Sequence, residues 1–145
     1  MTVQTPSPEV ILSLASQLAD VAAEQTLKWF RAPALVTQNK WAEGFDPVTE
    51  ADRAAEAAMR ALLKVQRPDD SVIGEEAQNT VGTSGLSWVL DPIDGTRGYV
   101  SGTPTWGTLI ALNDGQQPIF GVIDQPYTAE RFVGGLGMAF LERHG

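Results

Sequence analysis

The fold of this 145-residue chain is decided by a stretch that reads Thr108-Leu109-Ile110-Ala111-Leu112, then Asn113-Asp114-Gly115, then Ile119-Phe120-Gly121-Val122-Ile123. The two outer runs are rich in the apolar and β-branched residues that favour strands, and Asn-Asp-Gly is typical of a turn. Two strands joined by so short a connection form an antiparallel hairpin. A further strand is predicted at Arg131-Phe132-Val133, which precedes Gly134-Gly135.

Two more strands are predicted upstream of the hairpin. The run Ser71-Val72-Ile73 ends at Gly74. The run Leu86–Leu90 ends at Asp91-Pro92, where the residue before proline must be extended.

Two amphipathic helices are predicted before the strands. Ser7-Pro8-Glu9 supplies an N-cap, a proline at the first helical position and an acid in the first turn, and this helix is expected to run to about Phe30. Thr49-Glu50-Ala51-Asp52 has the pattern of a capping box that opens a second helix, which Pro68 closes. Apolar residues recur on one face of each helix, at Ile11, Leu14, Leu18, Val21 and Ala22 in the first and at Ala55, Ala58, Met59 and Leu62 in the second. Helices followed by hairpin-linked strands predict an α+β fold, a layered sandwich in which a helical pair covers a mainly antiparallel sheet, with residues 1–145 as a single domain.

The composition indicates that any catalysis or metal binding by this chain depends on carboxylate side chains. The chain has 18 Asp and Glu against 10 Lys and Arg, a net charge of −8, one histidine and no cysteine. The lack of cysteine excludes a disulfide scaffold, a thiol nucleophile and Cys-ligated metal centres. An acidic surface repels nucleic acid and anionic membranes, so neither is an expected partner. No run approaches the roughly 20 apolar residues that span a bilayer, and the N-terminus lacks the layout of a signal peptide, so a cytoplasmic protein is expected.

The acidic residues gather at the ends of predicted elements. Glu75 and Glu76 follow the strand that ends at Gly74, and Asp91 and Asp94 follow the strand that ends at Leu90. If these strands are neighbours, the carboxylates converge and repel one another unless a cation lies among them. Oxygen ligands without His or thiolate favour Mg²⁺, Mn²⁺ or Ca²⁺.

The stretch Asp91-Pro92-Ile93-Asp94-Gly95-Thr96 combines several features of a ligand loop. The proline restricts the loop, the two aspartates can turn towards one cation cluster, and Gly95 lets backbone N–H groups approach an anion. Each feature also has a structural explanation. Asp52 can be a capping residue, Glu75-Glu76 a solvated loop, and Asp-Pro or Asp-Gly a turn.

The order and spacing of three motifs resemble the metal-site motifs of the inositol monophosphatase family. The motifs are Asp46-Pro47-Val48-Thr49-Glu50-Ala51-Asp52, Gly74-Glu75-Glu76 and Trp88-Val89-Leu90-Asp91-Pro92-Ile93-Asp94-Gly95-Thr96. Three further runs are most similar to the histidinol-phosphatase branch of that family: Thr96-Arg97-Gly98-Tyr99, Thr105–Ile110 and Val122-Ile123-Asp124-Gln125-Pro126. The resemblance extends from about Pro8 to Phe140.

The resemblance implies Mg²⁺-dependent hydrolysis of a phosphate monoester, with Mn²⁺ as another usable cation. It assigns Glu75, Asp91 and the carbonyl of Ile93 to a first metal, and Asp91 with Asp94 to a second. Glu75 and Thr96 would position the attacking water, and Gly95 and Thr96 would offer N–H groups to the phosphate. Asp52 and Glu76 would lie near a third metal or its waters, and Lys40 beside the site.

The chain also departs from the family. Members are much longer and carry a later Trp-Asp motif that supplies a further carboxylate to the second metal, so this chain is expected to be an N-terminal part that is weakly active or inactive alone. The expected substrate is a small phosphorylated alcohol, histidinol phosphate or alternatively an inositol phosphate; a non-catalytic metal-binding or assembly protein is the other alternative. Uncovered apolar surface around Phe132, Leu136 and Phe140 predicts a homo-oligomer.

Overall fold

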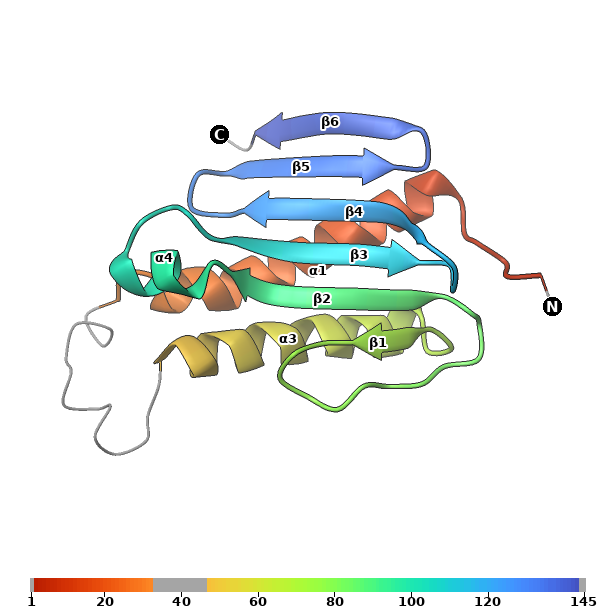
Figure 1. Cartoon of the computed structure of the whole chain (residues 1–145), viewed down its shortest axis with the longest axis horizontal. Coiled ribbons are helices and arrows are strands. Elements are labelled where there is room, and N and C mark those ends of the chain that lie inside the picture. Colours follow the sequence, from red (N-terminus) through yellow and green to blue (C-terminus); the bar gives the residue numbers. More distant parts are fainter. Residues whose placement is uncertain (1, 33–46, 144–145) are drawn as a thin grey trace.

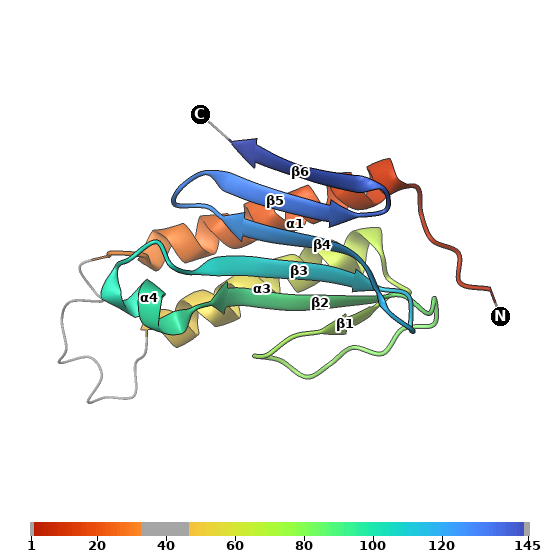
Figure 2. The ribbon, with the colours of Figure 1, turned by 45° about the horizontal axis from the view of Figure 1, so that its top comes forward.

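The computed structural model describes residues 2–32 and 47–143, which form a six-stranded sheet with two long helices on one face (Figure 1). The turned view in Figure 2 shows both helices on the same side of the sheet. This arrangement confirms the predicted α+β sandwich. The elements in chain order are α1 (Pro8–Trp29), α3 (Pro47–Gln66), β1 (Ser71–Ile73), β2 (Ser87–Asp94), α4 (Thr96–Ser101), β3 (Gly107–Asn113), β4 (Pro118–Gln125), β5 (Glu130–Gly135) and β6 (Met138–Arg143).

The strands lie in the sheet in the same order as in the sequence. β1 pairs with β2 in parallel, with Val72 opposite Trp88, and every other neighbouring pair is antiparallel. The predicted hairpin is β3–β4, and its turn is closed by Asp114, whose carboxylate accepts the N–H groups of Gln116 and Gln117 at 2.9 Å. Because β1 and β2 are parallel neighbours, both point towards the same end of the sheet, although β1 stops opposite Val89, five residues before β2 ends at Asp94.

The main core lies between the two helices and the covered face of the sheet. Burial of this apolar surface is the chief stabilising contribution, since each fully buried large side chain is worth about 1.5–3 kcal/mol. Ser7 caps α1 as predicted, because its hydroxyl accepts the N–H of Val10 at 3.3 Å. The largest fully buried side chains of this core are Ile11, Leu18, Met59, Leu63, Leu86, Trp88, Leu90, Ile110 and Leu112.

A second, smaller core holds α4 against the start of α3. Tyr99 of α4 is fully buried, and its hydroxyl donates to the carbonyl of Thr26 at 2.7 Å. The rings of Phe30 and Trp106 lie 5.3 and 4.9 Å from the Tyr99 ring, centroid to centroid, which is the range of favourable aromatic pairs. Val48, Ala51 and Ile93 complete this cluster. α4 is therefore fixed to α1, α3 and the end of β2.

Two predicted boundaries were wrong. α3 begins at Pro47, not at Thr49, because proline suits the first helical position and needs no N–H partner there. β2 does not end at Leu90 but continues through Pro92 to Asp94. The missing N–H of Pro92 is accommodated because the pairing register with β3 shifts between Asp91 and Asp94. The helix α4 and the strand β6 were not predicted.

The other face of the sheet is covered by no helix among residues 2–32 and 47–143 (Figure 1). The side chains that point from it are mostly apolar, and Ile123 and Phe132 are 54% and 47% exposed. We call this surface, formed by Val89, Leu109, Ala111, Ile123, Phe132 and Leu141, the open face. Leu136 and Phe140, which were predicted to be uncovered, are instead partly buried against the core. Phe140 points to the helix side of β6 by strand alternation, and Leu136 lies in the turn between β5 and β6. Within the described residues, neither long helix is apolar enough to cross a membrane.

Candidate active site

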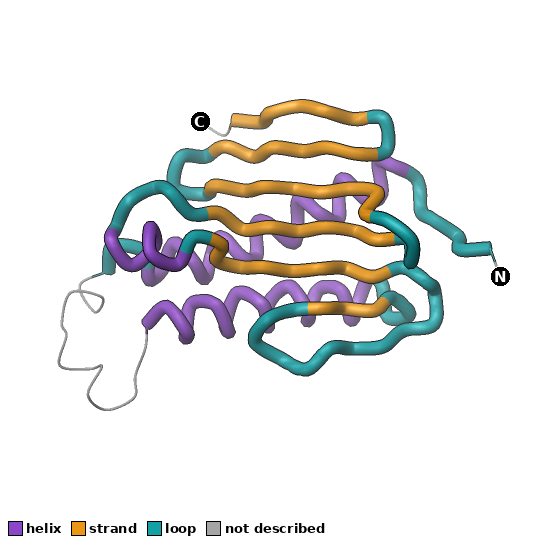
Figure 3. The backbone as a smooth tube through the Cα atoms, in the orientation of Figure 1, coloured by secondary structure: helices purple, strands orange, loops and turns teal. Residues whose placement is uncertain are grey.

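Four elements meet at one end of the sheet and bring the predicted acidic residues together. β2 ends there, the loop after β1 runs towards it, α3 begins there, and α4 starts directly after β2 (Figure 3). Glu75 and Glu76 follow β1, and Asp91 and Asp94 belong to the second half of β2. Asp52 lies in the second turn of α3. We call these five residues the acidic end.

Asp52 is the most buried carboxylate of the acidic end. Its side chain is only 8% exposed, and one carboxylate oxygen, Oδ1, is buried without a hydrogen-bond partner among residues 2–32 and 47–143. Burial, and then the charges of Glu76, Asp91 and Glu75, raise the pKa of Asp52 from 3.8 to about 7, while a hydrogen bond from the backbone N–H of Ile93 opposes the rise. Asp52 is therefore not the cap of α3 but an acid held inside the acidic end.

Asp91 has the same electrostatic character. Its Oδ1 is also buried and has no hydrogen-bond partner among the described residues. Burial, and then the charges of Glu75 and Asp94, raise the pKa of Asp91 from 3.8 to about 6. Two neighbouring carboxyls with raised pKa values and unused buried oxygens are the arrangement that a cation would relieve.

Glu75 and Glu76 differ in their surroundings. The side chain of Glu75 is exposed, whereas that of Glu76 is half-buried, and Arg53 Nε lies 3.6 Å from Glu76 Oε2. The Arg53 side chain is 63% exposed, so this ion pair contributes little to stability, about 0–1 kcal/mol. Glu75 is therefore the member of this pair whose carboxylate faces solvent beside Asp52 and Asp91.

The start of α4 places the remaining predicted residues at the surface. Asp94, Gly95 and Thr96 are all exposed. Gly95 has a φ of 85°, and a Cβ atom there would lie 2.5 Å from the carbonyl oxygen of Thr105, so this turn requires glycine. Ile93 itself is buried in the small core, and only its backbone can contribute to a site.

Two features of the prediction have no counterpart in the described structure. Lys40 lies outside the described residues. Within residues 2–32 and 47–143, no three His, Asp or Glu side chains are arranged as a ready-made metal site. The donor set nevertheless fits a hard divalent cation, because it consists of carboxylates and includes two buried oxygens, on Asp52 and Asp91, that no described residue hydrogen-bonds.

One residue of this region was missed by sequence reasoning. Glu56 lies one helical turn after Asp52, is 1% exposed, and accepts hydrogen bonds from the backbone of the Glu75–Ala77 segment. A signal was available, because Glu56 occupies the apolar face of the helix between Ala55 and Met59, both fully buried. A glutamate at such a position must have partners.

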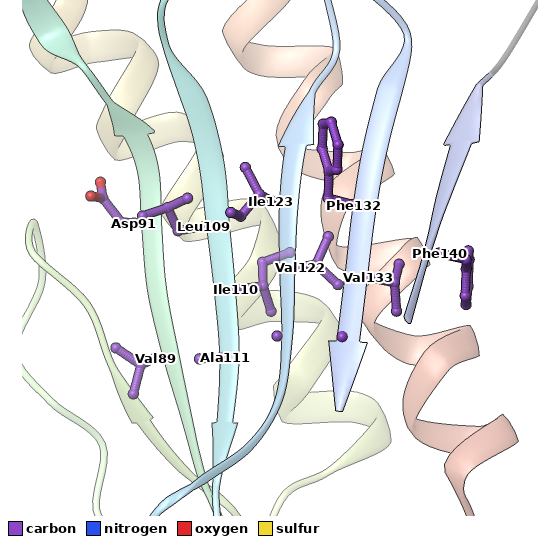
Figure 4. Close-up of a pocket in the computed structure, with 12 residues that line it drawn as sticks. Val89, Asp91, Leu109, Ile110, Ala111, Val122, Ile123, Phe132, Val133 and Phe140 are labelled. Atoms are coloured by element: carbon purple, nitrogen blue, oxygen red, sulfur yellow. The ribbon is translucent and has the colours of Figure 1, made fainter. Parts of the chain in front are cut away.

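The open face has a shallow apolar depression of about 770 Å³ that reaches the acidic end. Leu109, Ile123 and Phe132 line it, and Figure 4 shows the Asp91 carboxylate beside Leu109 at its margin. This surface has few polar groups, so it is unlike a site for a phosphorylated alcohol.

Comparison with known proteins shows which family and which relatives the chain is similar to. The profile of the inositol monophosphatase family matches residues 7–141. A histidinol-phosphatase of Streptomyces coelicolor is 45% identical over 125 residues, which are 83% of this chain and 46% of the relative. A histidinol-phosphatase of Mycobacterium tuberculosis is 42% identical over 121 residues, again 83% of this chain and 46% of the relative.

Solved structures of the same family also match the chain. An inositol monophosphatase from Zymomonas mobilis superposes with a TM-score of 0.77 at 40% sequence identity, and the match covers 95% of this chain and 52% of that protein. The chain thus spans about half the length of the relatives that it matches.

Proposed function

Because the chain belongs to the inositol monophosphatase family, we propose that its acidic end binds Mg²⁺, or Mn²⁺ in its place, and serves the hydrolysis of a phosphate monoester. The observation that carries this proposal is the pair of buried carboxylate oxygens on Asp52 and Asp91 that have no hydrogen-bond partner in the part of the chain that the structure describes. Repulsion among these ionised acids disfavours the metal-free state. A divalent cation among them would replace this repulsion with attraction between the cation and each carboxylate.

The residues of the acidic end have separate roles in this proposal. Asp91, near the end of β2, would be a ligand shared by two ions, with Glu75 as a second ligand of the first ion and Asp94 as a second ligand of the other. The backbone carbonyl of Ile93 would be a further ligand of the first ion. Asp52 and Glu76 would act on a third ion or its waters.

Hydrolysis of a phosphate monoester requires a water molecule positioned to attack the phosphorus atom. Divalent ions supply an acidified water and neutralise charge on the phosphoryl oxygens and the leaving alcohol oxygen. The exposed Glu75 carboxylate and the exposed Thr96 hydroxyl orient the attacking water. The backbone N–H groups of Gly95 and Thr96 would bind phosphate oxygens. The family resemblance adds Lys40, which lies outside the described residues, as a source of positive charge.

The proposed substrate is histidinol phosphate. Two histidinol-phosphatases match the chain at 42–45% identity, and this likeness favours that substrate over an inositol phosphate. The Zymomonas mobilis inositol monophosphatase, at 40% identity, keeps an inositol phosphate as the second candidate. Because the chain covers about half of these relatives, we propose that groups beyond this half supply most of the contacts to the alcohol and a further ligand to the second ion.

Calorimetric titration with Mg²⁺ and Mn²⁺ tests the metal site. We expect Asp91→Asn to weaken binding at least tenfold, since it removes a shared ligand and a charge. Asp69→Asn is the matched control, because Asp69 is an exposed aspartate before β1, away from the acidic end, and its replacement changes the net charge equally. Equal titration curves for the Asp91→Asn variant and the parent chain would refute the role of Asp91.

A non-catalytic role in assembly is the second candidate function. The observation that favours it is the open face, on which Ile123 and Phe132 are about half exposed. Apolar patches of this kind mark association surfaces. A chain that self-associates and binds no divalent cation would support this candidate over the phosphatase.

A further inference from the structure

Glu56 of α3 is a buried carboxylate whose partners all belong to or adjoin one loop. It is 1% exposed. Its oxygens accept the backbone N–H groups of Glu75 at 2.8 Å, Glu76 at 3.1 Å and Ala77 at 2.9 Å. Arg60 Nε, one helical turn further along α3, lies 3.1 Å from Glu56 Oε2. The first three residues after Gly74 therefore all donate their backbone N–H groups to the side chain of Glu56.

The chemistry of these contacts specifies a glutamate. An ionised carboxylate only accepts hydrogen bonds, with about four lone-pair positions, and Glu56 meets three N–H groups and one guanidinium. A glutamine would turn its own N–H₂ group towards one of these donors. The contact also specifies Gly74, because a Cβ atom there would lie 2.2 Å from Glu56 Oε1.

We propose that Glu56 is a positioning residue for the metal site: by holding the N–H groups of residues 75–77, it sets where the Glu75 carboxylate lies relative to Asp52 and Asp91. The inference deepens the proposed function and rests on it. Glu75 is exposed, so packing does not orient it, and the backbone of its loop does. Glu56 and Asp52 belong to the same helix, four residues apart, so one rigid element carries a proposed ligand and the anchor of another.

A second buried carboxylate provides a control within the same structure. Asp70 is 2% exposed, precedes the same strand β1 at its other end, and accepts from Trp88 Nε1 at 2.9 Å and from Ser84 Oγ at 2.7 Å. It also pairs with Arg67 at 2.8 Å. Asp70 thus matches Glu56 in burial and in its pairing with an arginine, but it contacts none of the residues of the acidic end. Replacing Asp70 therefore measures the loss of stability that follows when a buried structural carboxylate is removed.

The experiment compares Glu56→Gln with Asp70→Asn in the full chain. Amide hydrogen exchange measured by NMR reports the loop without any metal, and calorimetry with Mn²⁺ reports the site. We expect Glu56→Gln to speed exchange at residues 75–77 and to weaken Mn²⁺ binding about 10–100-fold, as loss of an outer contact to a metal ligand does. Asp70→Asn should leave Mn²⁺ affinity within about twofold, even where it lowers the free energy of unfolding equally.

A second variant keeps Glu56 itself intact. Gly74→Ala forces the loop away from the Glu56 carboxylate, and we expect it to reproduce both effects if Glu56→Gln does not fold. Unchanged Mn²⁺ affinity in the folded Glu56 or Gly74 variant, or equal weakening by Asp70→Asn, would overturn the inference. A parent chain that binds no Mn²⁺ would instead overturn the proposed function and the metal-positioning role together, and the exchange data would still decide whether Glu56 holds the loop.

Discussion

Replacing Asp52 by asparagine should stabilise the metal-free protein at alkaline pH. The carboxyl of Asp52 is buried beside Glu76, Asp91 and Glu75, and its pKa rises from 3.8 to about 7. A carboxyl whose pKa is higher in the folded state than in the unfolded chain contributes stability below its unfolded pKa. That contribution is lost as the pH rises through the folded pKa. Asparagine removes the charge and keeps an oxygen that can accept the N–H of Ile93.

The magnitude follows from the size of the pKa shift. At 1.36 kcal/mol per pKa unit, full ionisation of Asp52 costs the folded state about 4 kcal/mol relative to the unfolded chain. Between about pH 5.5 and about pH 8.5 the free energy of unfolding of the parent should fall by about 2 kcal/mol on account of Asp52, since about 1.5 units separate the lower pH from the folded pKa. The asparagine variant has no such ionisation and so lacks this loss. Its stability relative to the parent should therefore rise by about 2 kcal/mol over that interval.

Urea unfolding followed by circular dichroism in the presence of a chelator measures this difference. Both proteins are unfolded at about pH 5.5 and about pH 8.5, and the difference in unfolding free energy is compared between the two conditions. Adding Mg²⁺ at the higher pH should stabilise the parent more than the variant, because the ion binds the folded carboxylates. A difference between parent and variant that does not change with pH would refute the electrostatic description of the acidic end.

Three further predictions concern the turn before α4, the open face and catalysis. Gly95→Ala should lower the unfolding free energy by about 1–3 kcal/mol, because φ is 85° and the new Cβ meets the Thr105 carbonyl. Gly134→Ala, where a Cβ meets nothing within 4 Å, should change it by less than about 1 kcal/mol in the same urea experiment. The chain should self-associate in light scattering as its concentration rises, and Phe132→Ser should reduce this; a monomer at every concentration would contradict a role for the open face. In a steady-state assay at saturating Mg²⁺, the chain should hydrolyse histidinol phosphate far more slowly than a chimera that adds the second half of the Streptomyces coelicolor relative, with Asp94→Asn as the negative control; equal rates would show that the second half is dispensable.

Features with a local physical cause could be predicted from the sequence. The β3–β4 hairpin depends on turn residues that close it by their own side chains, and α1 on Ser7 and Pro8 at its first turn. The acidic residues could be predicted because strand ends and carboxylates are visible as patterns, and the family motifs contain them. The sequence alone therefore determined the layered fold and the identity of the acidic residues.

Features that depend on contacts between distant segments were decided only by the tertiary structure. β2 passes through Pro92 because pairing with β3 tolerates a register shift, and α4 forms over six residues because Tyr99 is buried against Phe30 and Trp106. The charges that add to burial in raising the pKa of Asp52 belong to Glu75, Glu76 and Asp91, which lie far along the chain. Glu56 acquires its three backbone N–H partners from residues 19 to 21 positions away. A local pattern indicates which residues are acidic, but the energy of a buried charge depends on everything packed around it, and that is a property of the folded chain.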